Sequence, residues 1–227
     1  MSAVEFSPWP KIPRLASPFI ITEKIDGTNA AVLIVEESFG AAVEVVPNLV
    51  AITFGHEVDE SGDPLHEYHV YAQSRSRFIT PINDNFGFAA WVRANAGILV
   101  EKLGPGRHFG EWWGNGIQRG YGLAKGDRRF SLFNTTRHEG LSVPEIGLGV
   151  VPRLDSSLAD LSMSWQSTMV AGALMRLGRL GSFAAPGFMN PEGVILFHAR
   201  SKQMFKQYLD PAKKADEVSK REQALAA

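Results

Sequence analysis

The stretch that decides how this chain folds begins at residue 21 and reads Ile21-Thr22-Glu23-Lys24-Ile25-Asp26-Gly27-Thr28-Asn29, followed by Ala30-Ala31-Val32-Leu33-Ile34-Val35. It places one lysine between two carboxylates, directly before a Gly-Thr-Asn turn and a run of apolar residues. A short apolar run rich in branched side chains is typical of a buried strand. The stretch therefore predicts a strand that ends near Lys24, a turn, and a second strand over residues 30–35.

Lys24 has two interpretations at this position. A lysine amine is ordinarily protonated near neutral pH, so a lysine nucleophile needs nearby cations, a metal ion or desolvation to expose its lone pair. An ordinary lysine at a strand end, followed by a turn, gives the same short Lys-x-Asp-Gly pattern. Taken alone, the pattern favours the ordinary lysine, so the rest of the chain must decide.

The composition limits the classes of protein that this chain can be. Its 227 residues, 44% of them hydrophobic, suffice for one core, as one domain or one domain with a small appendage. A formal net charge of −1 means that any contact with nucleic acid needs a local basic patch. The absence of cysteine excludes disulfides, thiolate zinc sites and cysteine nucleophiles. No secretory leader and no apolar run of ~18 residues is present, so we expect a cytoplasmic protein with no membrane contact.

The hydrophobic pattern predicts a mostly antiparallel α+β fold. Prolines over residues 1–20 indicate an extended arm, with Trp9 packed on the core. A turn cluster over residues 55–67 predicts a hairpin tip. Strands are expected at 30–35, within 43–54, and at 68–77, 107–113, 128–134, 150–154 and 193–197. Helices are expected at about 83–102, at 155–180 as one long or two short helices, and after Asp210 as a polar surface helix.

Several polar residues stand at the ends of these expected strands. Arg75 and Arg77 end one strand on the same face, where guanidinium groups suit phosphate or carboxylate; a solvated strand end is the alternative. Glu111 leads into a glycine-rich loop where backbone can approach a ligand closely. His66 and His69 lack the metalloprotease spacing, so we interpret them as loop histidines in solvent.

Six groups of residues follow one another in an order that carries more information than any single group. They are Glu23-Lys24-x-Asp26-Gly27-Thr28-Asn29; Arg75-Ser76 before Asp84-Asn85-Phe86-Gly87; Phe109-Gly110-Glu111 with Gly114-x-Gly116-Ile117-Gln118; Phe130-Ser131-Leu132-Phe133-Asn134; Glu192-Gly193-Val194-Ile195; and Phe205-Lys206. Together they resemble the RNA ligase 2 family of the covalent nucleotidyltransferases, over about residues 20 to 208. The resemblance implies a nucleotidyltransferase domain (an ATP-grasp-like ligase adenylation domain) of antiparallel sheets flanked by helices, over residues 1–208. Residues 209–227 would form a helical tail, with no OB-fold or separate C-terminal domain.

The resemblance also implies an activity and roles for individual residues. Lys24 would attack the α-phosphate of ATP, AMP would pass to an RNA 5′-phosphate, and a 3′-hydroxyl would displace it, as in a phage-type RNA-repair ligase. Arg75 and Lys206 would balance the phosphate charge, and Glu192 would hold Mg²⁺ or Mn²⁺. The nucleotide site would further include Glu23 at the adenine edge, Ile25, Glu111 at the ribose and Phe133 stacked on the base. Asn29 would serve the RNA-joining steps, with Asp26 near the phosphates and Lys202 as a second basic residue.

Two departures from the family pattern leave alternatives open. Met204 stands where the family usually has the first of two lysines, and Asn134 stands where aspartate is common. A compact DNA ligase, a guanylyltransferase, or a catalytically weak nucleotide- or RNA-binding module with the same fold fits the same residues. The short tail predicts that RNA is gripped by the catalytic domain, by a partner protein, or by both. We expect a monomer.

Overall fold

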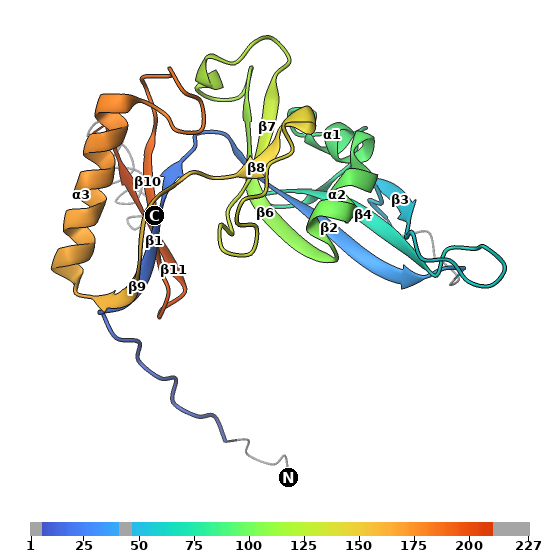
Figure 1. The fold of residues 1–227 in the computed structure, drawn as a ribbon, viewed down its shortest axis with the longest axis horizontal. Helices are drawn as coiled ribbons and strands as arrows, with labels where there is room; N and C mark the ends of the chain where they lie inside the picture. Colours follow the sequence, from blue (N-terminus) through green and yellow to red (C-terminus); the bar gives the residue numbers. More distant parts are fainter. Residues whose placement is uncertain (1–5, 41–46, 211–227) are drawn as a thin grey trace, which may run out of the picture. The chain divides into compact units, whose positions relative to one another are not determined.

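The computed structural model describes residues 6–40 and 47–210 (Figure 1). The first part of the strand region expected within 43–54, and the helix expected after Asp210, therefore lie largely outside the described residues. The chain forms two compact units. Unit 1 comprises residues 1–24, 153–180 and 192–227, and unit 2 comprises residues 25–152 and 181–191. The chain leaves unit 1 directly after Lys24 and re-enters it for the second time at Glu192.

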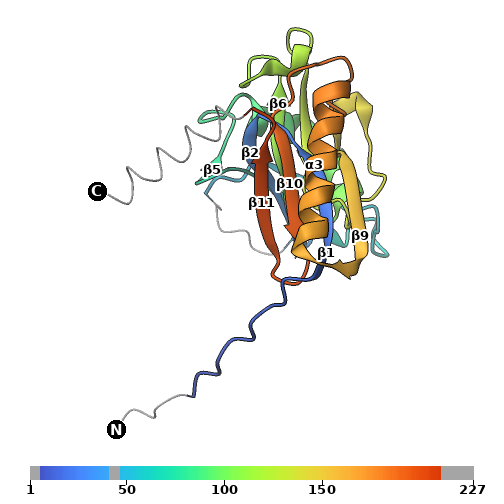
Figure 2. The same cartoon turned by 90° about the vertical axis from the view of Figure 1, so that its left-hand side faces the viewer.

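Unit 1 is an antiparallel sheet with one helix against it. Its elements are β1 (Ser17–Lys24), β9 (Arg153–Leu161), α3 (Met163–Leu180), β10 (Gly193–His198) and β11 (Gln203–Tyr208). The strand order is β11-β10-β1-β9, and every pair is antiparallel. Helix α3 lies along this sheet (Figure 2), and its Ala173 and Leu177 pack against Phe19, Ile21 and Val194 from the strands. Alternation along β1 thus fixes which side chains face the helix.

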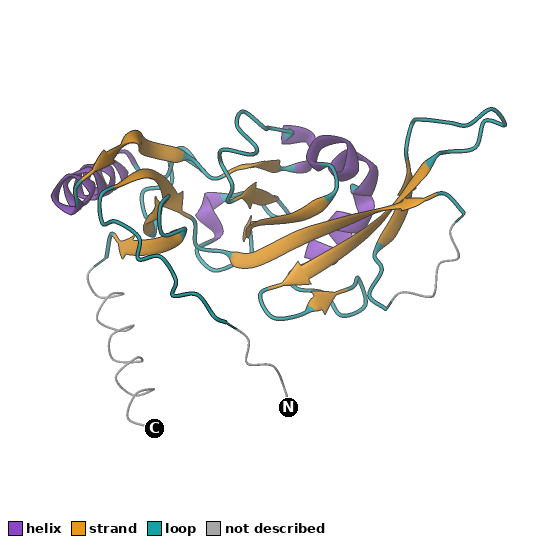
Figure 3. Cartoon of the chain, turned by 90° about the horizontal axis from the view of Figure 1, so that it is seen from below, coloured by secondary structure: helices purple, strands orange, loops and turns teal. Residues whose placement is uncertain are grey.

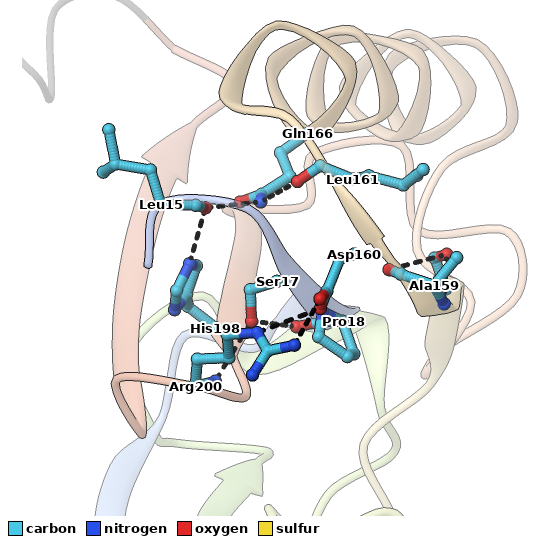
Figure 4. A network of polar contacts seen from close by, with 10 residues as sticks. Leu15, Ser17, Pro18, Ala159, Asp160, Leu161, Gln166, His198 and Arg200 are labelled. Carbon is cyan, nitrogen blue, oxygen red and sulfur yellow. Dashed lines mark hydrogen bonds and ion pairs between the residues drawn. The ribbon is translucent and has the colours of Figure 1, made fainter. Parts of the chain in front are cut away.

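A network of polar contacts fixes the start of β1, at the end opposite Lys24 (Figure 4). The Leu15 carbonyl accepts hydrogen bonds from His198 Nε2 at 3.0 Å and from Gln166 Nε2 at 3.2 Å. Ser17 Oγ accepts a bond from the Arg200 backbone N–H at 3.0 Å, and the Arg200 guanidinium pairs with Asp160. Because a one-residue slip would turn every β1 side chain to the other face, these contacts also determine which way Lys24 points.

Unit 2 is built on a larger sheet with two short helices. Its elements are β2 (Thr28–Ser38), β3 (Ala51–Phe54), β4 (His66–Ser74), β5 (Phe78–Ile79), α1 (Phe88–Ala94), α2 (Ala96–Leu103), β6 (Gly106–Gly114), β7 (Arg128–Leu132) and β8 (Leu148–Val150). The order is β3-β4-β2-β6-β7-β8, with β5 on β4, and only β7 and β8 are parallel among these strands. The α1 and α2 helices lie beside the β3–β4 part of the sheet (Figures 1 and 3). The mostly antiparallel α+β fold is thus confirmed.

The two faces of the unit 2 sheet differ in character because successive strand residues alternate between them. The core face carries Val32, Val70 and Phe130, which pack with Phe88 and Leu99 of the helices. The opposite face carries the polar or larger residues that alternate with these, among them Asn29, Glu111 and Trp113. We refer to it below as the open face.

The helix expected over residues 83–102 is two helices. They meet at Asn95, whose side-chain amide donates to the Trp91 carbonyl at 2.8 Å. The first helix begins at Phe88, with Gly87 at its N-cap position, and so starts later than expected. Asp84 precedes it, and its carboxylate accepts bonds from the backbone N–H groups of Ala89 and Ala90 in the first turn. Gly104 ends the second helix, close to the expected end at residue 102.

The helix expected over residues 155–180 is partly wrong. Residues up to Leu161 form strand β9, and only Met163–Leu180 is helical. The physical reason is pairing, because Asp155, Ser156 and Ser157 align with Ile21, Ile20 and Phe19 of β1. Leu158 is 97% exposed and does not face the core.

Two other expectations about side chains are wrong. Trp9 is 87% exposed in the extended arm and does not pack on the core. His69 is not a solvent-facing loop histidine, because it is buried in β4, and its Nε2 lies 2.8 Å from Glu67 Oε1.

No described helix is long and apolar enough to cross a bilayer.

A buried histidine in unit 2 leads to a prediction about pH and stability. His108 of β6 donates from Nε2 to the Gly104 carbonyl at 2.9 Å, and its Nδ1 lies 3.4 Å from Nε2 of His138. Burial lowers the pKa of His108 to about 4, with a smaller contribution from Arg137, and burial also lowers the pKa of His138. The unfolded chain therefore takes up these protons near pH 6.5 and the folded chain only at lower pH.

We expect the free energy of unfolding to fall as pH drops from about 6.5 towards 4, because the unfolded state then binds more protons than the folded state. The loss from His108 should be on the order of 2–3 kcal/mol. Urea unfolding at pH 7 and at pH 4.5 measures it. His108→Gln should reduce this pH dependence, and the same change at exposed His56 should not. An equal pH dependence in wild type and His108→Gln would contradict the prediction.

Candidate functional site

Lys24 forms an ion pair with a carboxylate far away in the sequence. Its Nζ lies 2.5 Å from Glu192 Oε2, across 168 residues of chain. The Glu192 side chain is 5% exposed, whereas the Lys24 side chain is 21% exposed. The pair arises because Lys24 is the last residue of β1 and Glu192 directly precedes β10, the strand that pairs with β1. The ammonium group is therefore held by a buried acceptor and remains accessible to a ligand.

A glycine and a tyrosine complete the surroundings of Lys24 in unit 1. In the sheet, Lys24 aligns with Gly193, and Gly193 aligns with Tyr208. The backbone packs tightly at Gly193, since a Cβ there would collide with the Gln207 carbonyl. Lys24 Nζ lies 5.7 Å from the centroid of the Tyr208 ring, and Lys206 Nζ lies 5.4 Å from the same centroid. Two cationic groups thus lie next to one aromatic ring, and together they could bind an anion.

In unit 2, the turn that follows Lys24 is bound to Glu111. The Gly27 backbone N–H donates to Glu111 Oε1 at 3.0 Å, and Asn29 Nδ2 lies 3.5 Å from Glu111 Oε2. Only glycine fits at position 27, because a Cβ there would lie 2.5 Å from the Trp112 carbonyl oxygen and 2.7 Å from Trp113 Cβ. The carboxylate therefore fixes the turn, and it is itself placed on the open face of β6.

Asp26 is held from two sides by residues of the glycine-rich loop. Its backbone N–H donates to the Tyr121 hydroxyl at 2.8 Å, and its Oδ2 accepts from Arg119 Nε at 2.9 Å. Arg119 Nη1 also donates to the backbone carbonyl of Asn190 at 2.8 Å and to its side-chain Oδ1 at 2.7 Å. Arg119 therefore joins two segments of unit 2 that lead directly to Lys24 and to Glu192 in the chain.

An aromatic cluster supports this loop. Ile25 packs with Trp113, Tyr121 and Val151, and Phe133 is packed against the same cluster while remaining partly exposed. Trp113 Nε1 donates to Ser131 Oγ at 2.9 Å. Ile25 thus packs within this cluster, and Phe133 remains partly exposed beside it.

The remaining predicted site residues are placed less distinctively. Glu23 is buried in β1. Arg75 is exposed after β4, and Lys202 is exposed in the turn before β11. Asn134, which stands where aspartate is common in the family pattern, has a local role, because its Oδ1 accepts a hydrogen bond from the backbone N–H of Arg137 at 2.9 Å.

Three residues of these groups were missed by sequence reasoning. Arg119 and Tyr121 belong to the glycine-rich loop. The glycines predict a loop there, but no local pattern indicates a role for these two side chains. Tyr208 stands two residues after Lys206 in β11, so strand alternation places both on one face; this signal could have identified it.

Unit 1 supplies the partly exposed amine of Lys24, bound to the buried carboxylate of Glu192, and a second cationic side chain, Lys206. Unit 2 supplies a separate carboxylate, Glu111, which holds the turn at Gly27. Among the described residues, no three His, Asp or Glu side chains gather to hold a metal ion by themselves. A cation at Glu192 would therefore need oxygen atoms from a ligand, as Mg²⁺ does when it binds through one carboxylate and substrate phosphates.

Comparison with known proteins gives a family. The model of the RNA ligase family matches residues 17–221. No curated protein sequence gives a significant match. Among solved structures, the chain is similar to a Naegleria gruberi RNA ligase with pyrophosphate (15% identity, TM-score 0.47, 90% of this chain and 52% of that one). A mutant of the same ligase with ATP and Mn also matches (16% identity, TM-score 0.45, 89% and 53%).

The chain thus spans about half the length of the solved structures that it matches. The family match, in contrast, covers most of this chain, from the first residue of β1 into the segment beyond β11. This range contains Lys24, Glu111, Glu192 and Lys206. The chain therefore belongs to the RNA ligase family.

Proposed function

We propose that this protein is an ATP-dependent RNA ligase that forms a lysyl–AMP intermediate at Lys24, transfers AMP to an RNA 5′-phosphate, and joins that end to a 3′-hydroxyl. The observation that carries the proposal is the 2.5 Å pair between Lys24 and Glu192 in a chain that the RNA ligase family model matches over residues 17–221. The Naegleria gruberi RNA ligase has been solved with ATP and Mn and with pyrophosphate, which are the nucleotide substrate and the leaving group of the proposed first step.

The first step needs an amine that is oriented and accessible. Glu192 Oε2 accepts a hydrogen bond from Lys24 Nζ and so fixes its direction. In the proposed reaction the Lys24 ammonium loses a proton to solvent, Nζ forms a bond to the α-phosphorus of ATP, and the bond from that phosphorus to the bridging oxygen breaks, so that pyrophosphate leaves. Lys206, which shares the Tyr208 ring with Lys24, would balance charge on the phosphate oxygens.

The next two steps use the same surroundings. An oxygen of the RNA 5′-phosphate attacks the phosphorus of the lysyl–AMP and releases the Lys24 amine. The 3′-hydroxyl oxygen of the other end then attacks the 5′-phosphate phosphorus, its proton passes to solvent, and AMP leaves. Phosphoryl transfer of this kind asks the protein mainly for positioning and charge neutralisation.

Glu192 is the residue that would hold a divalent cation, Mg²⁺ or Mn²⁺. A buried single carboxylate beside an accessible amine fits a cation whose other ligands are water and phosphate oxygens. A cation bound there would withdraw charge from the phosphate oxygens as the new bond forms. We further propose that Glu111 contacts the ribose, Phe133 the base and Arg75 a phosphate group.

The direct test is incubation of the purified protein with α-labelled ATP and Mg²⁺. We expect an acid-labile AMP adduct on the peptide that contains Lys24, and GTP should give far less. Strand joining on nicked RNA, nicked DNA and hybrid duplexes then identifies the polynucleotide. Absence of any adduct would refute the proposal, and preference for nicked DNA would replace it by a DNA ligase.

Arg119 gives a prediction about positioning. Because it ties Asp26 to Asn190, two residues after Lys24 and two before Glu192, its loss should loosen the pairing of the nucleophile with its acceptor. We expect Arg119→Ala to slow adduct formation by about 10- to 100-fold, since a displacement of ~1 Å costs this much. The KM for ATP should change much less than kcat.

The control for this prediction is Arg137→Ala. Arg137 also donates from its guanidinium to a backbone carbonyl, that of Pro105, in unit 2, and its hydrogen bonds among the described residues involve Pro105 and Asn134, which are distant in the chain from Lys24 and Glu192. We expect it to form the adduct at the wild-type rate. Equal rates for Arg119→Ala and wild type would show that Arg119 does not position Lys24.

A further inference from the structure

The open face of the unit 2 sheet continues from Glu111 across the strands as a series of cross-strand rows. Asn29 of β2 aligns with Glu111 of β6. In the next row on this face, Ala31 aligns with Phe109 of β6 and with Gln73 of β4, and Gln73 aligns with Phe78 of β5. One row further, Leu33 aligns with Tyr71 and with Arg107. Phe78, Arg107 and Phe109 therefore share one face with the proposed ribose carboxylate.

These three residues form what we call the Phe–Arg strip. The side chains of Phe109 and Phe78 are 52% and 36% exposed, and Arg107 is exposed as well. Arg107 Nη1 donates to Gln73 Oε1 at 2.9 Å, and its guanidinium carbon lies 5.9 Å from the centroid of the Phe78 ring. Arg107 thus reaches across β2 from β6 to β4. Between the two phenylalanines the row carries the small side chain of Ala31 and the amide of Gln73, which accepts the bond from Arg107, so the two rings lie on either side of short and polar side chains.

On this face the arginines lie in and beside the Phe–Arg strip, and the carboxylates lie beyond its two ends. The two rows of the Phe–Arg strip carry no carboxylate in the described strands, and the turn that leads into Phe78 adds exposed Arg75 and Arg77. Carboxylates lie beyond the strip at both ends, Glu111 on one side and the aligned pair Glu37 and Glu67 on the other. A positive segment with exposed aromatic rings is therefore limited to the strip.

We propose that the Phe–Arg strip binds an unpaired RNA strand next to the end that is to be joined, with bases stacked on Phe109 and Phe78 and a phosphate held by Arg107. The inference rests on the proposed function for the reason why RNA is present, and it adds where and how this chain grips it. Exposed aromatic rings interleaved with arginine are the means by which proteins hold single strands. Base pairing would hide the base faces from the rings, so the strip suits an unpaired strand.

The charge favours a nucleic acid over a protein partner. With a formal net charge of −1, the chain as a whole does not attract polyanions. The three arginines beside the two exposed rings, Arg75, Arg77 and Arg107, supply the local positive charge that binding of a nucleic acid needs. An apolar protein partner would find only two separated rings and a central guanidinium. The strip also adjoins Asn29 and Glu111, so a strand bound to it would lie on the face where the proposed nucleotide site begins.

The test measures binding of a fluorescein-labelled single-stranded RNA of about ten nucleotides, a length within the range of single-strand sites, by anisotropy and without ATP. We expect Phe109→Ala and Phe78→Ala each to weaken binding by about tenfold. On a strand that lacks the bases near its end, wild type and both variants should bind with the same lower affinity. A merely structural effect of the substitutions would weaken both strands alike and would overturn the proposal.

Phe54→Ala is the matched control. Phe54 is a phenylalanine on the same face, 51% exposed, but it aligns with Glu67 at the acidic end, so RNA binding should not change. Equal losses in Phe54→Ala and Phe109→Ala would contradict the strip as the site. Association of the protein with itself through Phe109, without RNA binding, would assign the strip to a protein contact and refute the proposal.

Arg107 provides a second, independent readout. Arg107→Gln should reduce the slope of log affinity against log salt by about 0.7, the value for one phosphate contact on a single strand. Arg107→Lys should retain that slope because it keeps the charge. Unchanged slopes in both variants would remove the phosphate contact from the proposal. Because these measurements contain no ATP, and adduct formation at Lys24 needs no RNA, failure of one does not imply failure of the other.

Discussion

Proteins carrying Lys24→Ala or Lys24→Arg will form no AMP adduct and will join 5′-phosphate RNA at a rate reduced on the order of 10⁴-fold or more, the scale of losing a covalent nucleophile. The arginine variant is the sharper of the two. Its guanidinium keeps a positive charge that can pair with Glu192, but it stays protonated and cannot attack phosphorus. Loss of the adduct in both variants would therefore show that the reaction needs the Lys24 amine as a nucleophile and not only its positive charge beside Glu192.

The same variants should behave differently with RNA that already carries AMP on its 5′-phosphate. The bond that Lys24 would form and break is not needed for that substrate, so we expect sealing to stay within about 100-fold of wild type. The control is Lys102→Ala, which removes an exposed lysine of α2 that pairs with Glu101 and should leave the adduct unchanged. An adduct on Lys24→Arg would contradict the assignment of the nucleophile.

Glu192→Gln should impair every step, in contrast to the Lys24 variants. The amide keeps the shape and one hydrogen-bond acceptor for Lys24 but removes the buried negative charge that the proposed cation needs. We expect adduct formation and sealing of pre-adenylylated RNA each to fall by about 10²- to 10³-fold, as when a charge-stabilising group is lost from an active site. The Mn²⁺ concentration needed for half-maximal activity should rise.

Asp155→Asn controls for the general loss of a carboxylate. Asp155 lies in the same unit and also accepts from a cationic side chain, since its Oδ2 is 3.2 Å from Arg176 Nη2. It should leave both steps near wild type. If Glu192→Gln slowed adduct formation but sealed pre-adenylylated RNA normally, Glu192 would serve only to orient Lys24.

Part of the fold could be predicted because its signals are local. The branched run that follows Asn29 became β2, alternation after Tyr68 became most of β4, and Asp84 and Gly104 mark the helical region between them. Each of these depends on side chains within one element, so neighbouring residues carry the information. The helix expected from Asp155 failed for the opposite reason, since that segment's strand conformation depends on pairing with β1.

Part of the candidate site could be predicted in the same way. The order of motifs indicates Lys24, Glu111, Glu192 and Lys206, because each belongs to a short motif whose members are neighbours in the chain. In the structure Lys24 ends β1 and Glu192 precedes β10, whereas Glu111 and Lys206 lie within β6 and β11. The contacts among them could not be predicted, since they join residues that are distant in the chain. Arg119 is the clearest example: its partners Asp26 and Asn190 lie 93 and 71 residues away, and no local pattern indicates them.

The amino-acid sequence alone determined that a lysine stands at a strand end before a tight turn, that the fold is a mostly antiparallel α+β arrangement, and that the motif order resembles RNA ligases. The tertiary structure alone decided that Lys24 is held by Glu192, that the Tyr208 ring lies within 6 Å of two lysine amines, and that Phe78, Arg107 and Phe109 share one face. The physical reason is that periodicity and turn chemistry act between neighbours, whereas strand pairing and its register bring distant side chains together.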